Sequence, residues 1–273
     1  MTLVPGTYVP DVGIDYPVDN PLARLMPVQK VTEIKADGNY PFLDDSFAYK
    51  FHHNFVYFLA DTLVRLLNKL KFGMRVEGRE NLKKYKKELS GGIVTVSNHC
   101  YRWDALCVHH AMRRRLVIPM LTDLFEGKDR YFVRYFGGIP LSDGSLSATR
   151  KFNAAFDEYH RRGACVHIFA EARSWPFYKP LRPFQKGAFT MAYRWNCPIV
   201  PLNLSFRPRT GIHKLFGAPE IPLITIKIGE PIFPDASQPR KVEVERLAKA
   251  THEAICRLGG IIKNPWPAVD NND

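Results

Sequence analysis

A histidine and an aspartate lie five residues apart, directly after an apolar run of the chain. The run is Ile93-Val94-Thr95-Val96-Ser97, and Asn98, His99 and Asp104 follow it. On one regular helix, positions five apart point ~140° away from each other, so the two side chains meet only if His99 lies in a turn and Asp104 in the first turn of the next helix. Asp104 can then accept a hydrogen bond from one imidazole N–H, while the other nitrogen takes a proton from a hydroxyl group. The spacing is compatible with such a general base, and also with a histidine that only caps a turn.

Short apolar strands alternate with helices from residue 74 onward. Strands are expected at residues 74–78, 92–97, 115–120, 138–141, 164–170, 198–205 and 223–229. Helices are expected at residues 103–113, 129–136, 146–162, 186–196 and 240–258. This alternation predicts an α/β fold with a mainly parallel central sheet flanked by helices. Sites in open sheets of this type gather at the carboxyl ends of strands, so the chemistry is expected in the loops at 97–104, 141–145 and 170–186.

The first 72 residues have a different character. Prolines are spaced throughout residues 1–47, which excludes a long helix and predicts an irregular, proline-rich arm that packs on the domain in places. In residues 48–72, apolar side chains recur at three- and four-residue steps, as in an amphipathic helix. Two interpretations of this apolar stripe remain open. It can cover the domain core, or part of it can lie in a lipid interface with the neighbouring basic residues near anionic head groups.

The composition limits the classes of partner. Lys and Arg outnumber Asp and Glu by 39 to 27, a net charge of +12 that suits nucleic acid, anionic lipid head groups or an acidic carrier protein. No run reaches the ~18 consecutive apolar residues of a spanning helix, and the first residues lack the basic start of a signal peptide. We therefore expect a soluble or peripheral, intracellular protein. The five cysteines include no C-x-x-C pair, so free thiols in a reducing compartment are expected, and no metal site.

Further motifs precede and follow the His–Asp pair. The pair itself reads N-H-x-x-x-x-D, and the other motifs are a lead-in strand with G-x-E-N-L at residues 76–82, Gly-Gly-Ile-Pro-Leu-Ser-Asp at 137–143, Phe-Ala-Glu at 169–171 with Lys-Gly-Ala at 186–188, and Ile-Val-Pro-Leu at 199–202. Their order and separations, over residues 74–205, resemble the four motifs of the glycerolipid acyltransferase superfamily, which includes the lysophosphatidate acyltransferases. The stretch at 171–183 is similar to a divergent bacterial branch with E-x-x-x-W and a basic, proline-rich loop.

The resemblance implies a one-step acyl transfer. His99, oriented by Asp104, would deprotonate an acceptor hydroxyl that attacks the thioester of acyl-CoA or acyl-carrier protein. The resemblance places Gly137 and Glu171 on the acceptor side and Pro201 at the pocket floor, with Asn98 as a further substrate-binding residue. The resemblance implies no metal ion or redox cofactor.

Two positions depart from the family pattern where it holds the acceptor phosphate with arginine. The second motif carries Asp143 at its usual arginine position, and the third carries Ser174 three residues after its glutamate. Because a phosphate in a cleft needs cationic donors, we hypothesise that Arg173 and Arg182 replace the missing pair, with Lys186 as a further donor.

Taken together, the sequence predicts an acyltransferase domain over residues 73–262, followed by a polar tail at 263–273. The leading function is acylation of a lysophospholipid, lysophosphatidate first, in phospholipid synthesis by a peripheral protein on the cytoplasmic face of a membrane. One alternative is acyl transfer to a glycolipid or another non-phosphate alcohol. A second is a non-catalytic protein that binds anionic membranes or nucleic acid. Nucleic acid is not an expected partner, because no surface of interleaved aromatic and basic residues is evident.

Overall fold

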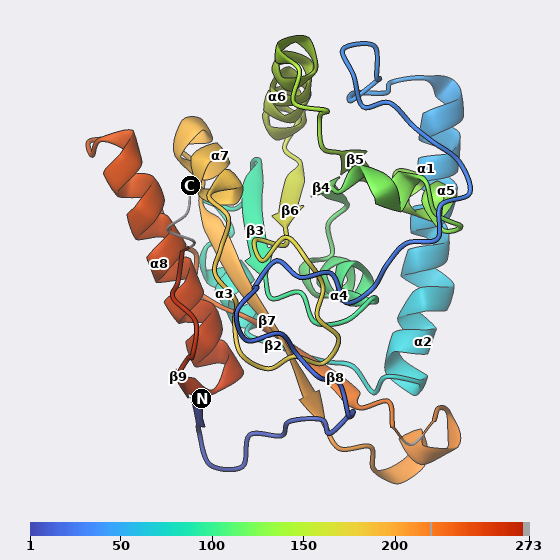
Figure 1. Ribbon diagram of the computed structural model, residues 1–273, viewed down its shortest axis with the longest axis vertical. Coiled ribbons are helices and arrows are strands. Elements are labelled where there is room, and N and C mark those ends of the chain that lie inside the picture. Colours follow the sequence, from blue (N-terminus) through green and yellow to red (C-terminus); the bar gives the residue numbers. More distant parts are fainter. Residues whose placement is uncertain (219, 270–273) are drawn as a thin grey trace.

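Seven strands form the central sheet in the computed structural model, which describes residues 1–218 and 220–269. They lie in the order β2-β8-β7-β3-β6-β4-β5 (Figure 1). Their bounds are β2 Arg75–Glu77, β3 Ile93–Ser97, β4 Leu116–Met120, β5 Gly138–Pro140, β6 Cys165–Ile168, β7 Ile199–Arg207 and β8 Leu223–Ile228. Neighbouring strands are parallel except β7 and β8, which are antiparallel. The mainly parallel sheet predicted from the sequence is confirmed.

Strand β3 explains how the sheet carries the His–Asp motif. It pairs with β6 on one side and β7 on the other, and all five of its residues are buried. Its side chains alternate between the two faces: Ile93 packs in the cluster that includes α4, and Val94 and Val96 pack in the cluster of α7 and α8. A strand that is buried along its whole length is what a parallel sheet covered on both faces requires. The next residues, Asn98 and His99, therefore leave the carboxyl end of a central strand.

Helices cover both faces of the sheet (Figure 1). The α-helices are α1 Phe47–Leu59, α2 Arg65–Leu70, α3 Arg79–Lys84, α4 Asp104–Met112, α5 Arg130–Tyr135, α6 Leu146–Arg161, α7 Gly187–Trp195 and α8 Arg240–Gly259. A π-helical turn, Ala60–Val64, joins α1 to α2, and 3-10 turns occur at Thr122–Phe125 and Gly211–Leu215. Buried residues of α1 and α4 belong to one core cluster, and those of α7 and α8 to another. Helix α6 has its own cluster with β5 and β6.

The element boundaries agree with the sequence expectations to within three residues at each end. Three features were not predicted. Helix α3 is only six residues long and has no buried residue, so it produces no apolar periodicity. Strand β8 runs antiparallel to β7. Strand direction depends on long-range pairing, which a local sequence pattern does not predict. A two-stranded antiparallel sheet joins β1, Thr2–Leu3, to β9, Ile261–Lys263, at opposite ends of the described chain.

The proline-rich arm has no helix before α1 and packs along the domain. Phe42 is buried edge-on against Phe152 of α6, with a ring-centroid distance of 5.6 Å. Further back, the carbonyl of Ala23 accepts a hydrogen bond from the indole of Trp175 at 2.8 Å. The arm therefore covers the loop that follows β6, which is one of the loops expected to carry the chemistry.

Most of the predicted apolar stripe on α1 and α2 faces solvent. The side of this helix that meets the core is formed instead by Tyr57 and Ala60, with Val56 and Val64 packed against the same cluster. The apolar residues of this segment that are more than half exposed are Phe47, Phe51, Phe55, Phe58, Leu63 and Leu66. The interpretation in which the stripe covers the core is therefore wrong for these residues.

The end of the described chain is packed rather than extended into solvent. Val269 is buried, and the carbonyl of Ala268 accepts a hydrogen bond from the backbone of Phe184 at 3.0 Å. The rest of the predicted polar tail, residues 270–273, lies outside the described residues. Among the helices of residues 1–218 and 220–269, none combines the length and apolarity needed to cross a membrane.

Candidate active site

His99 and Asp104 form a hydrogen-bonded pair at the carboxyl end of β3. His99 Nδ1 lies 3.0 Å from Asp104 Oδ2, with His99 in the loop and Asp104 as the first residue of α4. This is the only arrangement in which residues five apart meet, and the geometric prediction is confirmed. The same carboxylate oxygen accepts hydrogen bonds from the backbone N–H groups of Cys100 at 2.8 Å and Tyr101 at 2.9 Å. The loop therefore closes around the aspartate.

The environment of Asp104 keeps this pair in a fixed geometry. Its side chain is 1% exposed, and burial raises the pKa of the carboxyl, while the hydrogen bonds from His99, Tyr101 and Cys100 act in the opposite direction. Three donors on one oxygen leave the carboxylate little freedom to rotate. Because Asp104 accepts at Nδ1, the pair places the imidazole proton on that nitrogen and leaves Nε2 as the basic atom.

His99 is held on three further sides. Its ring stacks on Phe169 with centroids 4.0 Å apart and planes 18° apart. Its backbone N–H donates to Glu171 Oε1 at 2.8 Å, and its carbonyl accepts from the backbone of Trp175 at 3.0 Å. Its side chain remains 22% exposed, and Nε2 has no hydrogen-bond partner within residues 1–218 and 220–269. The arrangement presents one unpaired, oriented imidazole nitrogen to an incoming molecule.

Glu171 supports the loop that carries His99. It is 3% exposed, and its second oxygen, Oε2, accepts from the guanidinium Nε of Arg182 at 2.9 Å and from the Arg182 backbone at 3.1 Å. With Oε1 committed to His99, both oxygens of the carboxylate are occupied. In this structure Glu171 ties the loop after β6 to the loop after β3, and its predicted contact with the acceptor stays a prediction.

Arg182 is also removed from the predicted phosphate site. Its side chain is fully buried, and besides Glu171 its guanidinium donates to the carbonyls of Pro21 at 2.8 Å and Arg173. It also lies over the ring of Trp175, 4.4 Å from the centroid. All three nitrogens of this guanidinium therefore donate to acceptors inside the protein, and the side chain is closed to solvent. Arg173 differs: it is half-buried, and its guanidinium makes no hydrogen bond or ion pair with any other described residue.

Two more predicted substrate residues lie away from His99. Gly137 precedes β5 with φ +96° and sits against the carbonyl of Leu116, the first residue of β4. It therefore lies at the amino edge of the parallel strands, whereas His99 follows a carboxyl end. Pro201 is inside β7, where its ring lies against Gly229 on the side that Leu258 of α8 also approaches. The motif spacing specified neither the edge nor the face of the sheet on which these residues lie, and their contact with a substrate stays a prediction.

Asn98 and Lys186, the two remaining predicted substrate-binding residues, interact with other parts of the protein. Asn98 is 6% exposed and makes a two-way amide clamp with Leu204 of β7, donating to its carbonyl at 2.9 Å and accepting from its N–H at 2.7 Å. This clamp fixes the start of the loop that carries His99. Lys186 precedes α7 and is half-buried; it contributes, after Lys249, to lowering the pKa of Glu245 on α8. The positive charge of Lys186 therefore acts on Glu245 of α8.

The five cysteines are free and buried. Cys100, beside His99, is 2% exposed, and burial raises the pKa of its thiol well above the usual range. It therefore packs as a small apolar residue. In the part of the chain that the structure describes, no three His, Cys, Asp or Glu side chains gather as potential metal ligands.

Sequence reasoning did not identify the residues that hold His99. Phe169, Glu171 and Trp175 follow β6 in the sequence. They reach His99 because β6 lies beside β3, in the register Val96↔Ile168. One signal was available: both motifs follow predicted strands, and parallel neighbours bring the residues after their carboxyl ends together. The order of the strands in the sheet decides which strands are neighbours, and the sequence pattern does not specify this order.

A family model and a solved structure are similar to this chain. None of the curated proteins matches the chain. The crystal structure of PlsC from Thermotoga maritima, a 1-acyl-sn-glycerophosphate (LPA) acyltransferase, is similar at 20% sequence identity and a TM-score of 0.47, covering 78% of this chain and 84% of that chain. The family model described as Acyltransferase matches residues 73–205, which include the His–Asp pair, Glu171 and Pro201. Residues 73–205, just under half of the chain, are therefore similar to the acyltransferase family.

Proposed function

We propose that the protein transfers a fatty acyl group from a thioester to the hydroxyl of a lysophospholipid, with His99 as the general base. The observation that carries the proposal is the 3.0 Å pairing of His99 Nδ1 with buried Asp104. It leaves Nε2 without a partner among the described residues, on a side chain that is 22% exposed and lies in the segment similar to the acyltransferase family. A turn-capping histidine would not need a buried carboxylate with three donors, or a flat stacking partner such as Phe169.

In the proposed reaction, His99 Nε2 takes the proton of the acceptor hydroxyl as its oxygen attacks the thioester carbonyl. The imidazolium that forms is stabilised by Asp104, which also holds the ring in one tautomer. Collapse of the tetrahedral intermediate breaks the C–S bond, and the thiolate leaves with the proton from His99. The products are an ester and a free thiol, and the histidine returns to its starting state. This sequence uses no metal ion or redox cofactor, because proton transfer and the thioester supply the chemistry.

For the acceptor, we place lysophosphatidate first and Arg173 at its phosphate. Arg173 is two residues beyond Glu171 and keeps an uncommitted guanidinium, the group best suited to bind phosphate oxygens in pairs. A neutral acceptor, such as a glycolipid or simple alcohol, is the second candidate. Two observations favour it: Arg182 is committed to Glu171, and an exposed Asp143 occupies the position of the family's usual arginine.

The proposed place of reaction is the cytoplasmic face of a membrane, with the protein bound peripherally. The exposed apolar residues of α1 and α2 form a continuous stripe, and contiguous apolar surface of this kind is typical of membrane or protein contact. Arg65 and Lys69 are exposed on the same segment and suit anionic head groups. The donor is acyl-CoA or acyl-carrier protein; the net charge of +12 is favourable for either anionic carrier.

The test is an acyl-transfer assay on the purified chain. Lysophosphatidate, other lysophospholipids, a monoacylated glycolipid and a long-chain alcohol are offered in turn, each with acyl-CoA and with acyl-carrier protein. Thiol release and ester formation are both measured, so that hydrolysis is separated from transfer. Transfer to lysophosphatidate above the other acceptors supports the proposal. Preference for a neutral acceptor selects the second candidate, and thiol release without an ester product contradicts transfer.

A further inference from the structure

A pocket of about 310 Å³ opens at the edge of the sheet opposite His99. It lies where β4 and β6 begin, beside Leu116, Val117, Ala164 and Cys165. Since Cys165 pairs in register with Ile93, and His99 is six residues further along, the pocket is about 20 Å from His99 along the strand direction. The volume is within the ~300–1,000 Å³ range of small-molecule sites. The pocket is therefore separate from the catalytic pair.

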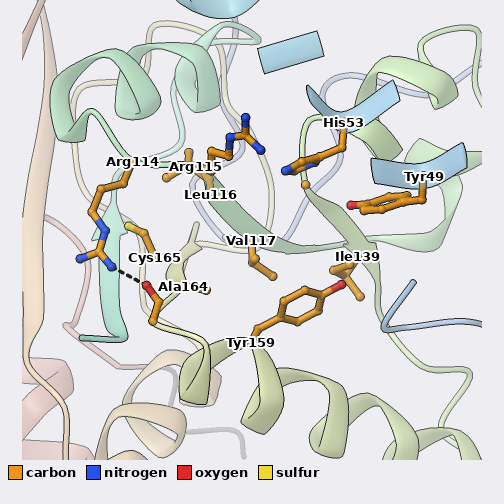
Figure 2. Close-up of a pocket in the computed structure, with 12 residues that line it drawn as sticks. Tyr49, His53, Arg114, Arg115, Leu116, Val117, Ile139, Tyr159, Ala164 and Cys165 are labelled. Carbon is orange, nitrogen blue, oxygen red and sulfur yellow. Dashed lines mark hydrogen bonds between the residues drawn. The ribbon is translucent and has the colours of Figure 1, made fainter. Parts of the chain in front are cut away.

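The walls of the pocket are mainly apolar. Figure 2 shows Val117 and Ile139 from neighbouring strands, with the ring of Tyr159 from α6 across from them. Val117 stays half-exposed although it lies in a central region of the fold, because its side chain borders this space. Cys165 adds a buried thiol whose pKa is raised by burial, so this wall is uncharged as well. Such walls suit a hydrocarbon chain.

Three polar side chains, those of Arg115, Tyr49 and His53, also line this pocket. Arg115 uses one guanidinium nitrogen on Asn54, at 2.6 Å, and its other N–H groups have no acceptor in residues 1–218 and 220–269. The Tyr49 hydroxyl has no hydrogen-bond partner in this part of the chain either, and in Figure 2 it points into the space between His53 and Tyr159. His53 bonds the carbonyl of Tyr135 through Nδ1 at 3.0 Å, which leaves its Nε2 unpaired.

Arg114, the other arginine at the pocket, is already committed. Its guanidinium donates to the carbonyls of Leu89, Gly91 and Gly163, at 2.9, 2.8 and 2.6 Å. The pocket therefore offers one guanidinium that is only partly committed, to Asn54 and to the face of the Tyr57 ring, rather than a cationic cluster. One guanidinium with a neighbouring hydroxyl matches the two oxygens of a carboxylate, and the pocket has too few cationic donors for a phosphate of higher charge.

We propose that this pocket binds a single-chain carboxylate, a free fatty acid of medium length, at a site distinct from the active site. The chain lies against Val117, Ile139 and Tyr159, and the carboxylate meets Arg115 and the Tyr49 hydroxyl. Because Tyr49 and His53 belong to α1, whose outer side carries the exposed apolar stripe, the ligand joins this helix to β4 and β5. Binding therefore stabilises the folded protein in proportion to ligand occupancy.

The test is calorimetric titration of the full chain with decanoate, kept below its micelle concentration. Decanol carries the same chain without the charge, and acetate carries the charge without the chain. We expect decanoate to bind at least about tenfold more tightly than either, since a charge-assisted contact and a buried chain both contribute. Equal binding of decanol would overturn the role of Arg115, and equal binding of acetate would overturn the apolar site.

Variants locate the bound molecule. Arg115→Gln should weaken decanoate about tenfold or more, while Arg113→Gln, its exposed neighbour in the same basic run, should bind like the wild type. Ile139→Trp and the milder Val117→Phe fill the pocket with a larger side chain. Circular dichroism and cooperative unfolding show which of these variants fold like the wild type, and a variant that folds should lose decanoate binding. Unchanged affinity in Arg115→Gln, or in a folded pocket-filling variant, would contradict the proposal.

Discussion

The carboxylate of Glu171 accepts a hydrogen bond from the backbone N–H of His99 at 2.8 Å, across 72 positions of sequence. The other oxygen of this carboxylate holds the fully buried guanidinium of Arg182 at 2.9 Å. Arg182 in turn binds the carbonyl of Pro21 in the N-terminal arm. The loop that carries the candidate base is therefore braced by the loop after β6 and, through it, by the arm. The third family motif supports the first motif in this chain.

This brace predicts a large stability loss when one partner is removed. Glu171→Gln leaves the Arg182 charge buried without a counter-charge, and breaking a buried ion pair costs about 3–5 kcal/mol of unfolding free energy. Urea unfolding measures it. The double variant Glu171→Gln with Arg182→Met should recover part of the loss, because no lone charge then remains buried. A single variant that loses no more than Glu245→Gln, at an exposed ion pair, would show that the brace is unimportant.

A second prediction concerns Asp104. Asp104→Asn keeps the side-chain shape but removes the charge and favours the wrong imidazole tautomer, so turnover should fall by about two to four orders of magnitude. The chain supplies a matched control, because Asp61 lies 3.0 Å from His109 Nε2 in another His–Asp pair. Asp61→Asn should leave turnover near the wild-type value. Similar losses of turnover in both variants would mean that the effect of Asp104→Asn does not depend on its pairing with His99.

The sequence predicted the strands, the main helices and the His99–Asp104 contact because each depends on local pattern. Apolar runs specify buried strands, and a spacing of five residues restricts how two side chains meet. The wider site was less predictable. Arg182 has the residue type expected at a phosphate, yet long-range contacts with Glu171 and Pro21 bury it. Gly137 was misplaced for a related reason: a motif does not say at which edge of the sheet it lies.

A third prediction concerns the acceptor. Arg173→Ala should raise the KM for lysophosphatidate roughly ten- to a hundredfold, because one charge-assisted contact is worth about 1.5–3 kcal/mol. The KM for a neutral alcohol acceptor should hardly change, which makes the second substrate an internal control. Steady-state kinetics with both acceptors measures the difference. If both acceptors lose equally, Arg173 has a structural role and does not contact the phosphate.

The exposed stripe gives a fourth prediction. Leu63→Asp combined with Leu66→Asp should reduce binding to anionic vesicles without lowering the melting temperature, because both side chains are more than half exposed. Vesicle sedimentation at two salt concentrations measures binding, and added salt should weaken it in the wild type. Leu215→Asp, at an exposed apolar residue outside α1 and α2, serves as the control. Undiminished vesicle binding by the folded double variant would exclude this segment as the anchor.

The most direct test of the account is acyl transfer by His99→Ala under single-turnover conditions, with a thioester donor and lysophosphatidate in vesicles. We predict that the wild-type chain forms the ester with matching thiol release. His99→Ala should fold normally and form the ester about two to four orders of magnitude more slowly, the usual loss for a general base. A folded His99→Ala variant that transfers the acyl group within a few-fold of the wild-type rate would contradict the assignment of His99 as the base.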